Sequence, residues 1–314
     1  MKGFLNLSKV KHFFFIFFPL FLLAVFLLLL SLEIYFSEFI NKTILLPNPK
    51  SAIASVEYPV LRSEFNPYIS AEGAIIMDAD SKVVLYAKNP DLRFTLASTT
   101  KIMTAITALD YFKLGDILTV KGSSFQGSIV GLKQGEKITF ENLLYGMLLP
   151  SGNDAAITIA DNFNGGEREF VKIMNENAQK WQLINTHYED TSGLDDGNYT
   201  TPLDLARLAA IAIKNPEFAK IVSTKERIIS DISGKDVYQL ENLNKLLGYD
   251  GVNGIKTGYT EEAGQVLVTS EPFYDNRGKH TVVIVVMGSE DRFADTQTLL
   301  DQLSGKVSYL TIHP

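Results

Sequence analysis

The sequence predicts an α+β fold: an antiparallel sheet flanked by N- and C-terminal helices, with a mostly helical subdomain at about residues 113–223. Short strand-like segments lie on both sides of a long helical block, and an amphipathic segment follows the second group of strands. The later strand segments are joined by short links. These links favour antiparallel pairing, because parallel strands need crossover connections of a dozen or more residues.

The first two strands are expected to form a hairpin. Ala74–Met77 and Val83–Tyr86 are apolar runs on either side of the turn sequence Asp78–Ser81. From Ser98 onward the apolar residues recur every three to four positions, which predicts a helix through Leu109.

The remaining elements follow in chain order. Helical patterns lie at about 140–148, 153–163, 167–181 and 202–213, and strand patterns at 225–230, 237–241, 255–260, 265–270 and 280–287. Asn153 or Asp154 is expected to cap the second of these helices, and Thr201–Pro202 is a typical helix start. A last amphipathic helix is expected from about Arg292 to Leu303.

Residues 13–32 are apolar except for Pro19 and Ser31. A helix of this length spans about 30 Å, the thickness of a bilayer core. The segment is preceded by three lysines, and the next positive residue is Lys42, so residues 1–12 are expected in the cytoplasm. The sequence thus predicts a single-pass anchor with the rest of the chain outside the cytoplasm.

A cleaved signal peptide is the alternative interpretation of this segment. Its apolar core would be shorter and closely followed by a small-residue cleavage site. The first such triplet, Ala52–Ala54, lies well beyond the apolar run, which favours an uncleaved anchor. We expect a tether over residues 33–65, which contain three prolines, and a folded domain over residues 66–314.

Composition excludes several classes of protein. The chain has no cysteine, so disulfide scaffolds, cysteine-ligated metals and thiol nucleophiles are excluded. Two of the four histidines, His12 and His313, lie near the chain ends, which argues against a histidine metal site, and we read His187 and His280 as structural. The net charge of −7 argues against a nucleic-acid partner.

A serine and a lysine one helical turn apart form the first candidate for chemistry. Ser98 lies at a predicted helix start, where backbone N–H groups have no helical partner, and Lys101 lies on the same face. A serine hydroxyl needs a base, and a lysine can act as one when it is neutral. Burial and a neighbouring cation such as Lys256 would favour the neutral form.

Two further motifs follow along the chain. Ser151 and Asn153 lie at a turn between two apolar helices and supply a hydroxyl for proton relay and an amide for a peptide group. Lys256 and Thr257 lie on a predicted strand and supply a cation and a hydroxyl for a carboxylate, while Gly258 allows close approach of a substrate backbone.

Each motif alone also has an ordinary structural interpretation. Ser98 could be a helix cap, Lys101 a solvated helix charge, and Lys256 an edge-strand lysine that deters aggregation. The apolar flanks Leu96–Ala97 and Ile102–Met103 indicate instead that the helix start is buried, where an idle lysine would be costly.

Together the motifs resemble those of the D-alanyl-D-alanine carboxypeptidases among the low-molecular-mass penicillin-binding proteins. The resemblance covers roughly residues 68–303, and it rests on Ala97–Thr104, Ser151–Ala155, Gly254–Gly258, Thr186–Tyr188, Ser192–Leu194 and Ala263–Gly264. The resemblance implies a β-lactamase/transpeptidase-like fold and a reaction that uses no metal or other cofactor.

The resemblance implies a role for each motif residue. Ser98 would be the acylated nucleophile, Lys101 its general base and Ser151 a proton relay, while Asn153 would hold the substrate. The implied activity is removal of the terminal D-Ala from peptidoglycan stem pentapeptides through an acyl-enzyme, with β-lactams as covalent inhibitors.

The third motif would bind the end of the substrate. The resemblance implies that Lys256 and Thr257 bind the terminal carboxylate, with help from Arg292 at the start of the last helix. The N–H groups of Ser98 and Tyr259 would form the oxyanion hole. Many relatives also carry a C-terminal β-rich domain and an amphipathic anchor, whereas this chain stops at Pro314.

The sequence is compatible with three alternatives. A D,D-endopeptidase acting on cross-links would use the same motifs. A class A β-lactamase would need a deacylating glutamate, for which Glu241 is the nearest candidate, and its position just before the Lys256 strand does not fit that class. A non-catalytic scaffold that binds wall peptide is disfavoured because all three motifs are intact. The oligomeric state is not fixed by the sequence.

Overall fold

The computed structural model describes residues 7–43, 56–122, 124–275 and 278–312, and these fall into two units. The first contains helix α1 (Leu7–Thr43), which is continuous over the predicted anchor. Its stretch Phe18–Ser37 is long and apolar enough to cross a membrane, a property that signal sequences share. The second unit, Val56–Ile312, carries all the predicted site residues.

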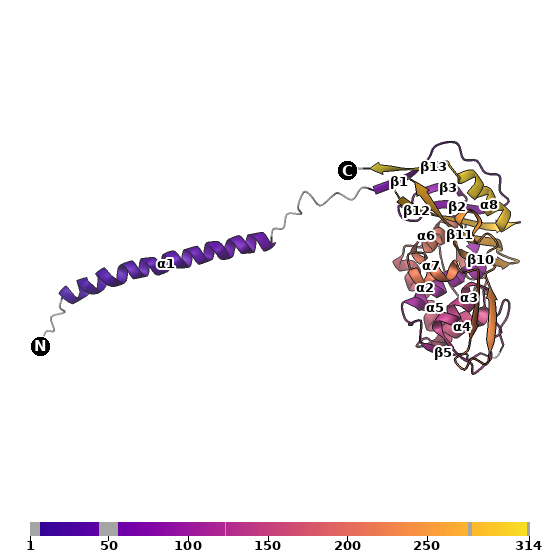
Figure 1. The fold of residues 1–314 in the computed structure, drawn as a ribbon, viewed down its shortest axis with the longest axis horizontal. Coiled ribbons are helices and arrows are strands. Elements are labelled where there is room, and N and C mark those ends of the chain that lie inside the picture. Colours follow the sequence, from indigo (N-terminus) through magenta and orange to yellow (C-terminus); the bar gives the residue numbers. More distant parts are fainter. Residues whose placement is uncertain (1–6, 44–55, 123, 276–277, 313–314) are drawn as a thin grey trace. The chain divides into compact units, whose positions relative to one another are not determined.

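A five-stranded antiparallel sheet forms the centre of the second unit (Figure 1). The strand order is β10–β11–β12–β2–β3, with bounds Ile255–Thr260, Gly264–Asp275, Gly278–Ser289, Gly73–Asp78 and Val84–Lys88. The β2–β3 hairpin is the predicted one, and its turn is closed by the Asp78 carboxylate, which accepts hydrogen bonds from the backbone and hydroxyl of Ser81.

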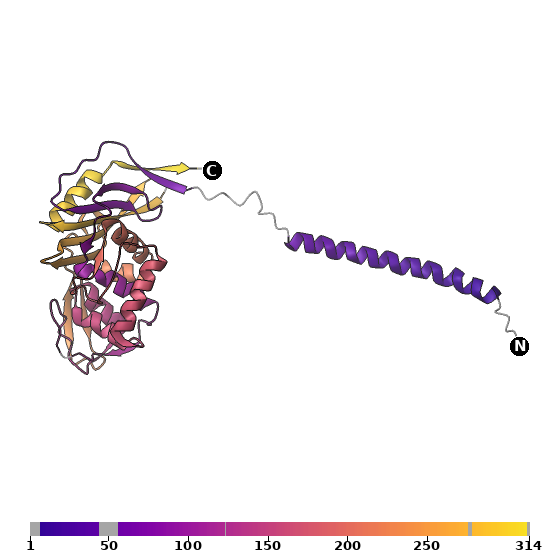
Figure 2. The ribbon, with the colours of Figure 1, turned by 180° about the vertical axis from the view of Figure 1, so that it is seen from behind.

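Strand β2 is buried on both faces, and every one of its residues is buried. Side chains alternate between the faces of a strand. Ile75 and Met77 therefore join a core with the helical block, whereas Ala74 and Ile76 join a second core with the C-terminal helix. That helix, α8 (Arg292–Leu303), lies against the sheet (Figure 2). Its residues Leu299, Leu300 and Leu303 belong to the second core.

In the sequence, the helical block lies between β3 and β10. Its helices are α2 (Thr100–Leu109), α3 (Phe140–Leu148), α4 (Asn153–Asn162), α5 (Gly166–Lys180), α6 (Pro202–Ala212) and α7 (Pro216–Val222), and all but the last were expected from the sequence. The Thr201 side chain caps α6 as the Thr–Pro pair predicted. Helix α7 was missed because it is only two turns long, although Asn215 caps it.

Short paired strands complete the block. They are β4 (Phe94–Thr95) with β7 (Tyr199–Thr200), β5 (Ile117–Thr119) with β6 (Lys137–Thr139), and β8 (Glu226–Ser230) with β9 (Val237–Glu241). Two 3₁₀ turns also occur, η1 (Ala97–Thr99) and η2 (Tyr249–Gly251). The predicted strands at 225–230 and 237–241 are the β8–β9 hairpin.

The start of the second unit differs from the expected tether over residues 33–65. Helix α1 continues to Thr43, and β1 (Val56–Leu61) pairs in antiparallel fashion with β13 (Val307–Ile312). Strand β1 was not predicted because it contains Pro59. Proline lacks an N–H and is tolerated in a strand only where no ladder hydrogen bond is needed. A two-stranded pair leaves one side of each strand free of ladder bonds, so Pro59 fits there.

The helices that cover the sheet also differ in one detail from the expectation. In the described part of Val56–Ile312, no helix precedes β2, so the face opposite α8 is not covered by an N-terminal helix. Instead α6, with α2 beside it, packs against that face from the middle of the chain. The α+β class itself is confirmed.

Candidate active site

Ser98 lies in the 3₁₀ turn that leads into α2, on a backbone held between two glycines. A Cβ on Gly193 would lie 1.8 Å from the carbonyl oxygen of Ala97, and a Cβ on Gly258 would lie 3.2 Å from the Ala97 side chain. Only glycine fits at position 193, and a side chain at position 258 would press on Ala97. Ser98 itself is half-buried, so its hydroxyl keeps access to a ligand.

The Lys101 amine is fully buried and faces three oxygen atoms. Its Nζ lies 3.0 Å from Ser98 Oγ, 2.6 Å from Asn153 Oδ1 and 2.6 Å from the carbonyl oxygen of Ser192. The predicted serine–lysine pair is therefore in hydrogen-bond contact. The helix start is buried, as its apolar flanks indicated.

Burial lowers the pKa of Lys101 to about 7, against the opposing effect of the carboxylates of Asp190 and Asp154. Desolvation disfavours the charged form of an amine. At neutral pH a large share of Lys101 is therefore neutral and able to take a proton from Ser98.

Ser151 and Asn153 come from the turn before α4. Asn153 is the first residue of α4 rather than its cap, which is Gly152 without a side-chain bond. Its amide accepts from Lys101 and donates from Nδ2 to the carbonyl of Gln126. Ser151 is buried at φ 66°, and its hydroxyl has no partner among the described residues. A buried hydroxyl without a partner is costly, so this one is available for a substrate or a proton.

The expected capping by Asp154 is also wrong. This buried carboxylate accepts hydrogen bonds from the backbone N–H groups of Val130, Gly131 and Leu132. It therefore fixes the segment that precedes α3 and follows Gln126, the residue that holds the Asn153 amide.

The third motif lies on β10, next to the serine. Lys256 and Thr257 are buried, and Gly258 faces the backbone N–H of Ser98 at 3.3 Å from its Cβ position. Burial, followed by the charges of Lys101 and Arg292, holds the pKa of Lys256 well below its usual range. An anionic ligand at this point would relieve that repulsion.

Arg292 and Tyr259 lie at the same end of β10. The Arg292 guanidinium donates from Nη1 to the carbonyl of Gly258 at 2.7 Å, and burial lowers its pKa. Its buried Nε has no partner within the described ranges. Tyr259 is exposed, so its side chain adds no buried group to the site.

Other titratable groups lie in structural settings. His187 pairs with Glu189, and His280 stacks on Tyr309 with ring centroids 3.4 Å apart. Both agree with a structural reading. Glu241, the residue that the β-lactamase alternative would need, is exposed on β9 opposite Glu226.

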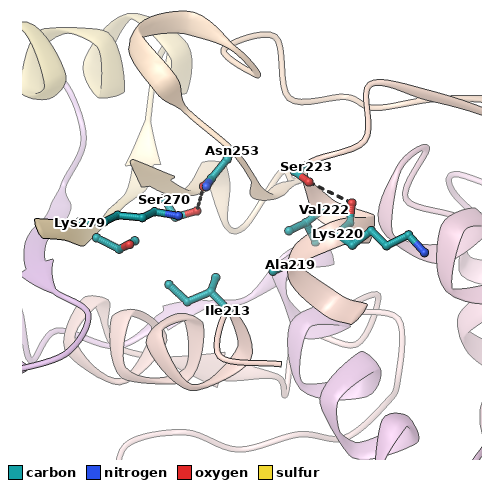
Figure 3. Close-up of a pocket in the computed structure, with 9 residues that line it drawn as sticks. Ile213, Ala219, Lys220, Val222, Ser223, Asn253, Ser270 and Lys279 are labelled. Carbon is teal, nitrogen blue, oxygen red and sulfur yellow. Dashed lines mark hydrogen bonds between the residues drawn. The ribbon is translucent and has the colours of Figure 1, made fainter. Parts of the chain in front are cut away.

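A cavity of about 330 Å³ lies elsewhere, between α7 and the strands β11 and β12 (Figure 3). Asn253 and Ser270 meet at its edge through a hydrogen bond of 2.5 Å, and Lys220 runs away from them. None of the nine predicted site residues lines this cavity.

The sequence of residues 61–291 matches the family described as D-alanyl-D-alanine carboxypeptidase, which is more than half of the chain. The chain belongs to this family. The match confirms the resemblance drawn from the three motifs.

Individual carboxypeptidase-family members support the assignment. The D-alanyl-D-alanine carboxypeptidase DacF of Bacillus subtilis is 34% identical over 243 aligned positions, and the alignment covers 74% of this chain and 61% of DacF. The chain therefore spans less than two thirds of that relative. A D-alanyl-D-alanine endopeptidase of Pseudomonas aeruginosa is 32% identical, over 74% of this chain and 76% of that protein.

The fold is also shared with a solved structure. The crystal structure of the Streptomyces K15 DD-transpeptidase superimposes with a TM-score of 0.69 at 32% identity. The superposition covers 76% of this chain and 98% of the other. This likeness confirms the predicted transpeptidase-like fold.

The motifs did not identify every residue of this candidate site. Ser192 contacts Lys101 through its backbone carbonyl, and Asp190 and Asp154 organise loops around the amine. Two signals pointed to the loop of Asp190: Ser192–Leu194 carried part of the resemblance, and an aspartate followed three residues later by Gly193 is a turn signal.

Proposed function

We propose that this protein is a membrane-anchored serine D-Ala-D-Ala carboxypeptidase that trims peptidoglycan stem pentapeptides. The observation that carries the proposal is the buried Lys101 amine within hydrogen-bond distance of Ser98 Oγ and Asn153 Oδ1. It joins the nucleophile and base of the first motif to Asn153 of the second motif, in a chain of the carboxypeptidase family.

In the acylation step, Ser98 Oγ attacks the carbonyl carbon of the penultimate D-Ala. Its proton passes to the neutral amine of Lys101, and the resulting alkoxide-like oxygen of the substrate faces the N–H groups of Ser98 and Tyr259. Protonated Lys101, with Ser151 as a relay, returns the proton to the leaving nitrogen. The peptide bond breaks, free D-Ala departs, and the remaining peptide stays as an ester on Ser98.

Deacylation reverses the roles of the same groups. A water molecule gives a proton to Lys101 and attacks the ester carbon, and Ser98 leaves with a proton returned from Lys101. Lys256, Thr257 and Arg292 bind the terminal carboxylate in the first step, which positions the scissile bond. The reaction needs no metal or other cofactor.

We infer the topology from α1. Residues 1–12 are cytoplasmic and α1 spans the cell membrane once, so the catalytic unit acts on the extracytoplasmic side, where peptidoglycan lies. The lysines before the apolar run support this orientation. β-Lactams, which resemble D-Ala-D-Ala, are expected to acylate Ser98.

The full chain in detergent tests the proposal. It should release D-Ala from a stem pentapeptide, and Ser98→Ala should reduce release to background, while a penicillin should add its mass to the wild type alone. Release at the wild-type rate by Ser98→Ala would overturn the mechanism.

A second candidate activity is cleavage or formation of cross-links, since one relative is named an endopeptidase and a structural neighbour a DD-transpeptidase. All three reactions share the acyl-enzyme and differ in which amine leaves and whether water or an amine accepts the acyl group. Product analysis with a pentapeptide, a cross-linked dimer and an added amine acceptor separates them.

A further inference from the structure

A single carboxylate shapes the loop that follows β-bridge residue His187 and precedes β7. The Asp190 side chain accepts hydrogen bonds from four consecutive backbone N–H groups, those of Ser192 (3.0 Å), Gly193 (2.6 Å), Leu194 (2.9 Å) and Asp195 (2.9 Å). It also accepts from the Ser192 hydroxyl and the Asn198 amide. The loop is therefore wrapped around this one group, which fixes the directions of its carbonyls.

Two consecutive carbonyls of the wrapped loop face α2. The carbonyl of Thr191 accepts from the hydroxyl of Thr104 at 2.7 Å, and the carbonyl of Ser192 accepts from the amine of Lys101 at 2.6 Å. Lys101 and Thr104 are one helical turn apart on the same face of α2. The two carbonyls therefore attach the loop to this face by two hydrogen bonds. The side chain of Thr191 is held in turn by Glu167.

The Ser192 carbonyl has a stereochemical consequence for the base. A neutral lysine amine has two N–H groups and one lone pair. Asn153 Oδ1 and the Ser192 carbonyl, both at 2.6 Å, accept hydrogen bonds and cannot donate them, so they take the two N–H groups. The lone pair is then left toward Ser98 Oγ, from which it can take a proton.

We propose that Asp190 is a positioning residue for the reaction at Ser98: it holds the Ser192 carbonyl against Lys101 and so aims the lone pair of the base at the nucleophile. The inference rests on the proposed function and extends it to a residue outside the three motifs. Asp190 touches neither Ser98 nor the substrate and acts through Ser192.

The charge of Asp190 acts on the base as well. The charged groups facing Lys101 are Lys256 on β10, Asp154 on α4 and Asp190 on the loop. The two carboxylates favour the ammonium form and oppose the larger effect of burial. Loss of the Asp190 charge should therefore lower the pKa of Lys101, and loss of the Ser192 anchor removes an acceptor from the ammonium in the same direction.

The direct test is titration of Lys101 by NMR in the full chain, with ¹³Cε-labelled lysine and the resonance assigned by Lys101→Met. Asp190→Asn is expected to lower the apparent pKa of Lys101 by about one unit. Asp190→Ser also removes the charge and keeps a turn-forming side chain, so it provides the measurement if Asp190→Asn does not fold. Asp196→Asn is the matched control, because Asp196 is an exposed carboxylate of the same loop.

The second readout is the rate of Ser98 acylation by a penicillin as a function of pH. Asp190→Asn should shift the acidic limb with the measured pKa and reduce the plateau rate by about 10- to 100-fold, since the base is misaligned. Asp196→Asn should coincide with the wild type in both measurements.

The outcomes separate the two proposals. An unchanged Lys101 titration in Asp190→Asn and Asp190→Ser, or an equal shift in Asp196→Asn, overturns the positioning role. A shifted titration with a plateau acylation rate equal to that of the wild type also overturns it, because loss of the charge alone would shift the titration. If no penicillin acylates even the wild type, the proposed reaction at Ser98 is overturned, whereas a shifted titration would still show that Asp190 acts on Lys101.

Discussion

Gly193 lies against the carbonyl of Ala97, with its missing Cβ 1.8 Å from the oxygen and 3.0 Å from the N–H of Ser98. The two residues are far apart in the sequence, yet this contact fixes the backbone that carries Ser98, the proposed nucleophile. Ala97 has a φ of 46°, which non-glycine residues rarely adopt. The close contact supports that strained backbone from one side, and Gly258 supports it from the other.

Gly193→Ala should therefore abolish acylation of Ser98 and lower stability. The new Cβ would force the loop away from Ala97, and the positive φ of Gly193 adds a cost of about 1 kcal/mol. Gly234→Ala is the matched control, since Gly234 also has a positive φ but nothing within 4 Å of its Cβ position. Penicillin labelling and thermal unfolding measure both effects; normal labelling of Gly193→Ala would contradict the argument.

The rate of acylation should rise with pH through about 7 and then level. Only neutral Lys101 can accept the Ser98 proton, and burial places its pKa at about 7. Lys101→Arg should reduce acylation by about 10²- to 10⁴-fold at every pH, because a guanidinium stays protonated. Stopped-flow rates between pH 5 and 9, in steps of roughly half a unit, would show the limb. A flat profile for the wild type would exclude lysine as the base.

Arg292→Gln should weaken binding of the terminal carboxylate. Its guanidinium is held by the Gly258 carbonyl beside Lys256, and a charge-assisted hydrogen bond is worth about 1.5–3 kcal/mol. We expect kcat/KM for a pentapeptide to fall at least about tenfold, while the same peptide with an amidated C-terminus should be affected little. Equal losses for both peptides would show that Arg292 serves the fold instead.

Glu271 should make stability fall as pH rises. Burial, with a further effect of Asp250, raises the pKa of its carboxyl to about 8, above the ordinary value of about 4.3. The folded state therefore keeps a proton on Glu271 that the unfolded state loses. Its contribution to the free energy of unfolding is complete below the unfolded pKa and is lost as the pH rises through about 8.

Glu271→Gln should flatten this dependence and be more stable than the wild type at pH 9, by about 1 kcal/mol. Glu262→Gln, at an exposed position after β10, is the control and should follow the wild type. Urea unfolding at pH 6 and pH 9 measures the difference. Parallel pH dependence in both variants would contradict the role of Glu271.

The candidate site could be predicted from three motifs because the chemistry of each motif is carried by side chains a few residues apart. Ser98 and Lys101 are one turn apart, so their contact follows from helix geometry alone. The Ser192 carbonyl could not be predicted in this way. A backbone oxygen has no residue signature, and this one is brought to Lys101 across 91 positions of the chain by the tertiary fold.

The fold was predictable where local signals agree and not where pairing is distant. Thr201–Pro202 marks the start of α6, and helices α3 to α6 lie close to their predicted positions. Strand β1 carries Pro59 and pairs with the last strand of the unit, so neither its composition nor its neighbours in the chain indicate a sheet. Asp154 lies two residues after the cap Gly152, but its carboxylate binds the backbone of residues 130–132. That partner is set by the tertiary fold and has no local signal in the sequence.

The β1–β13 pair also determines where this unit can be attached. Val56 is paired with Ile312, so β1 and β13 run side by side in opposite directions. The start of β1 therefore lies next to the end of β13. A segment joined to either end would leave the unit from the same place. Moving the attachment from one terminus to the other would therefore leave the direction in which the Ser98 site is presented nearly unchanged, and the two arrangements become interchangeable solutions for evolution or for protein engineering.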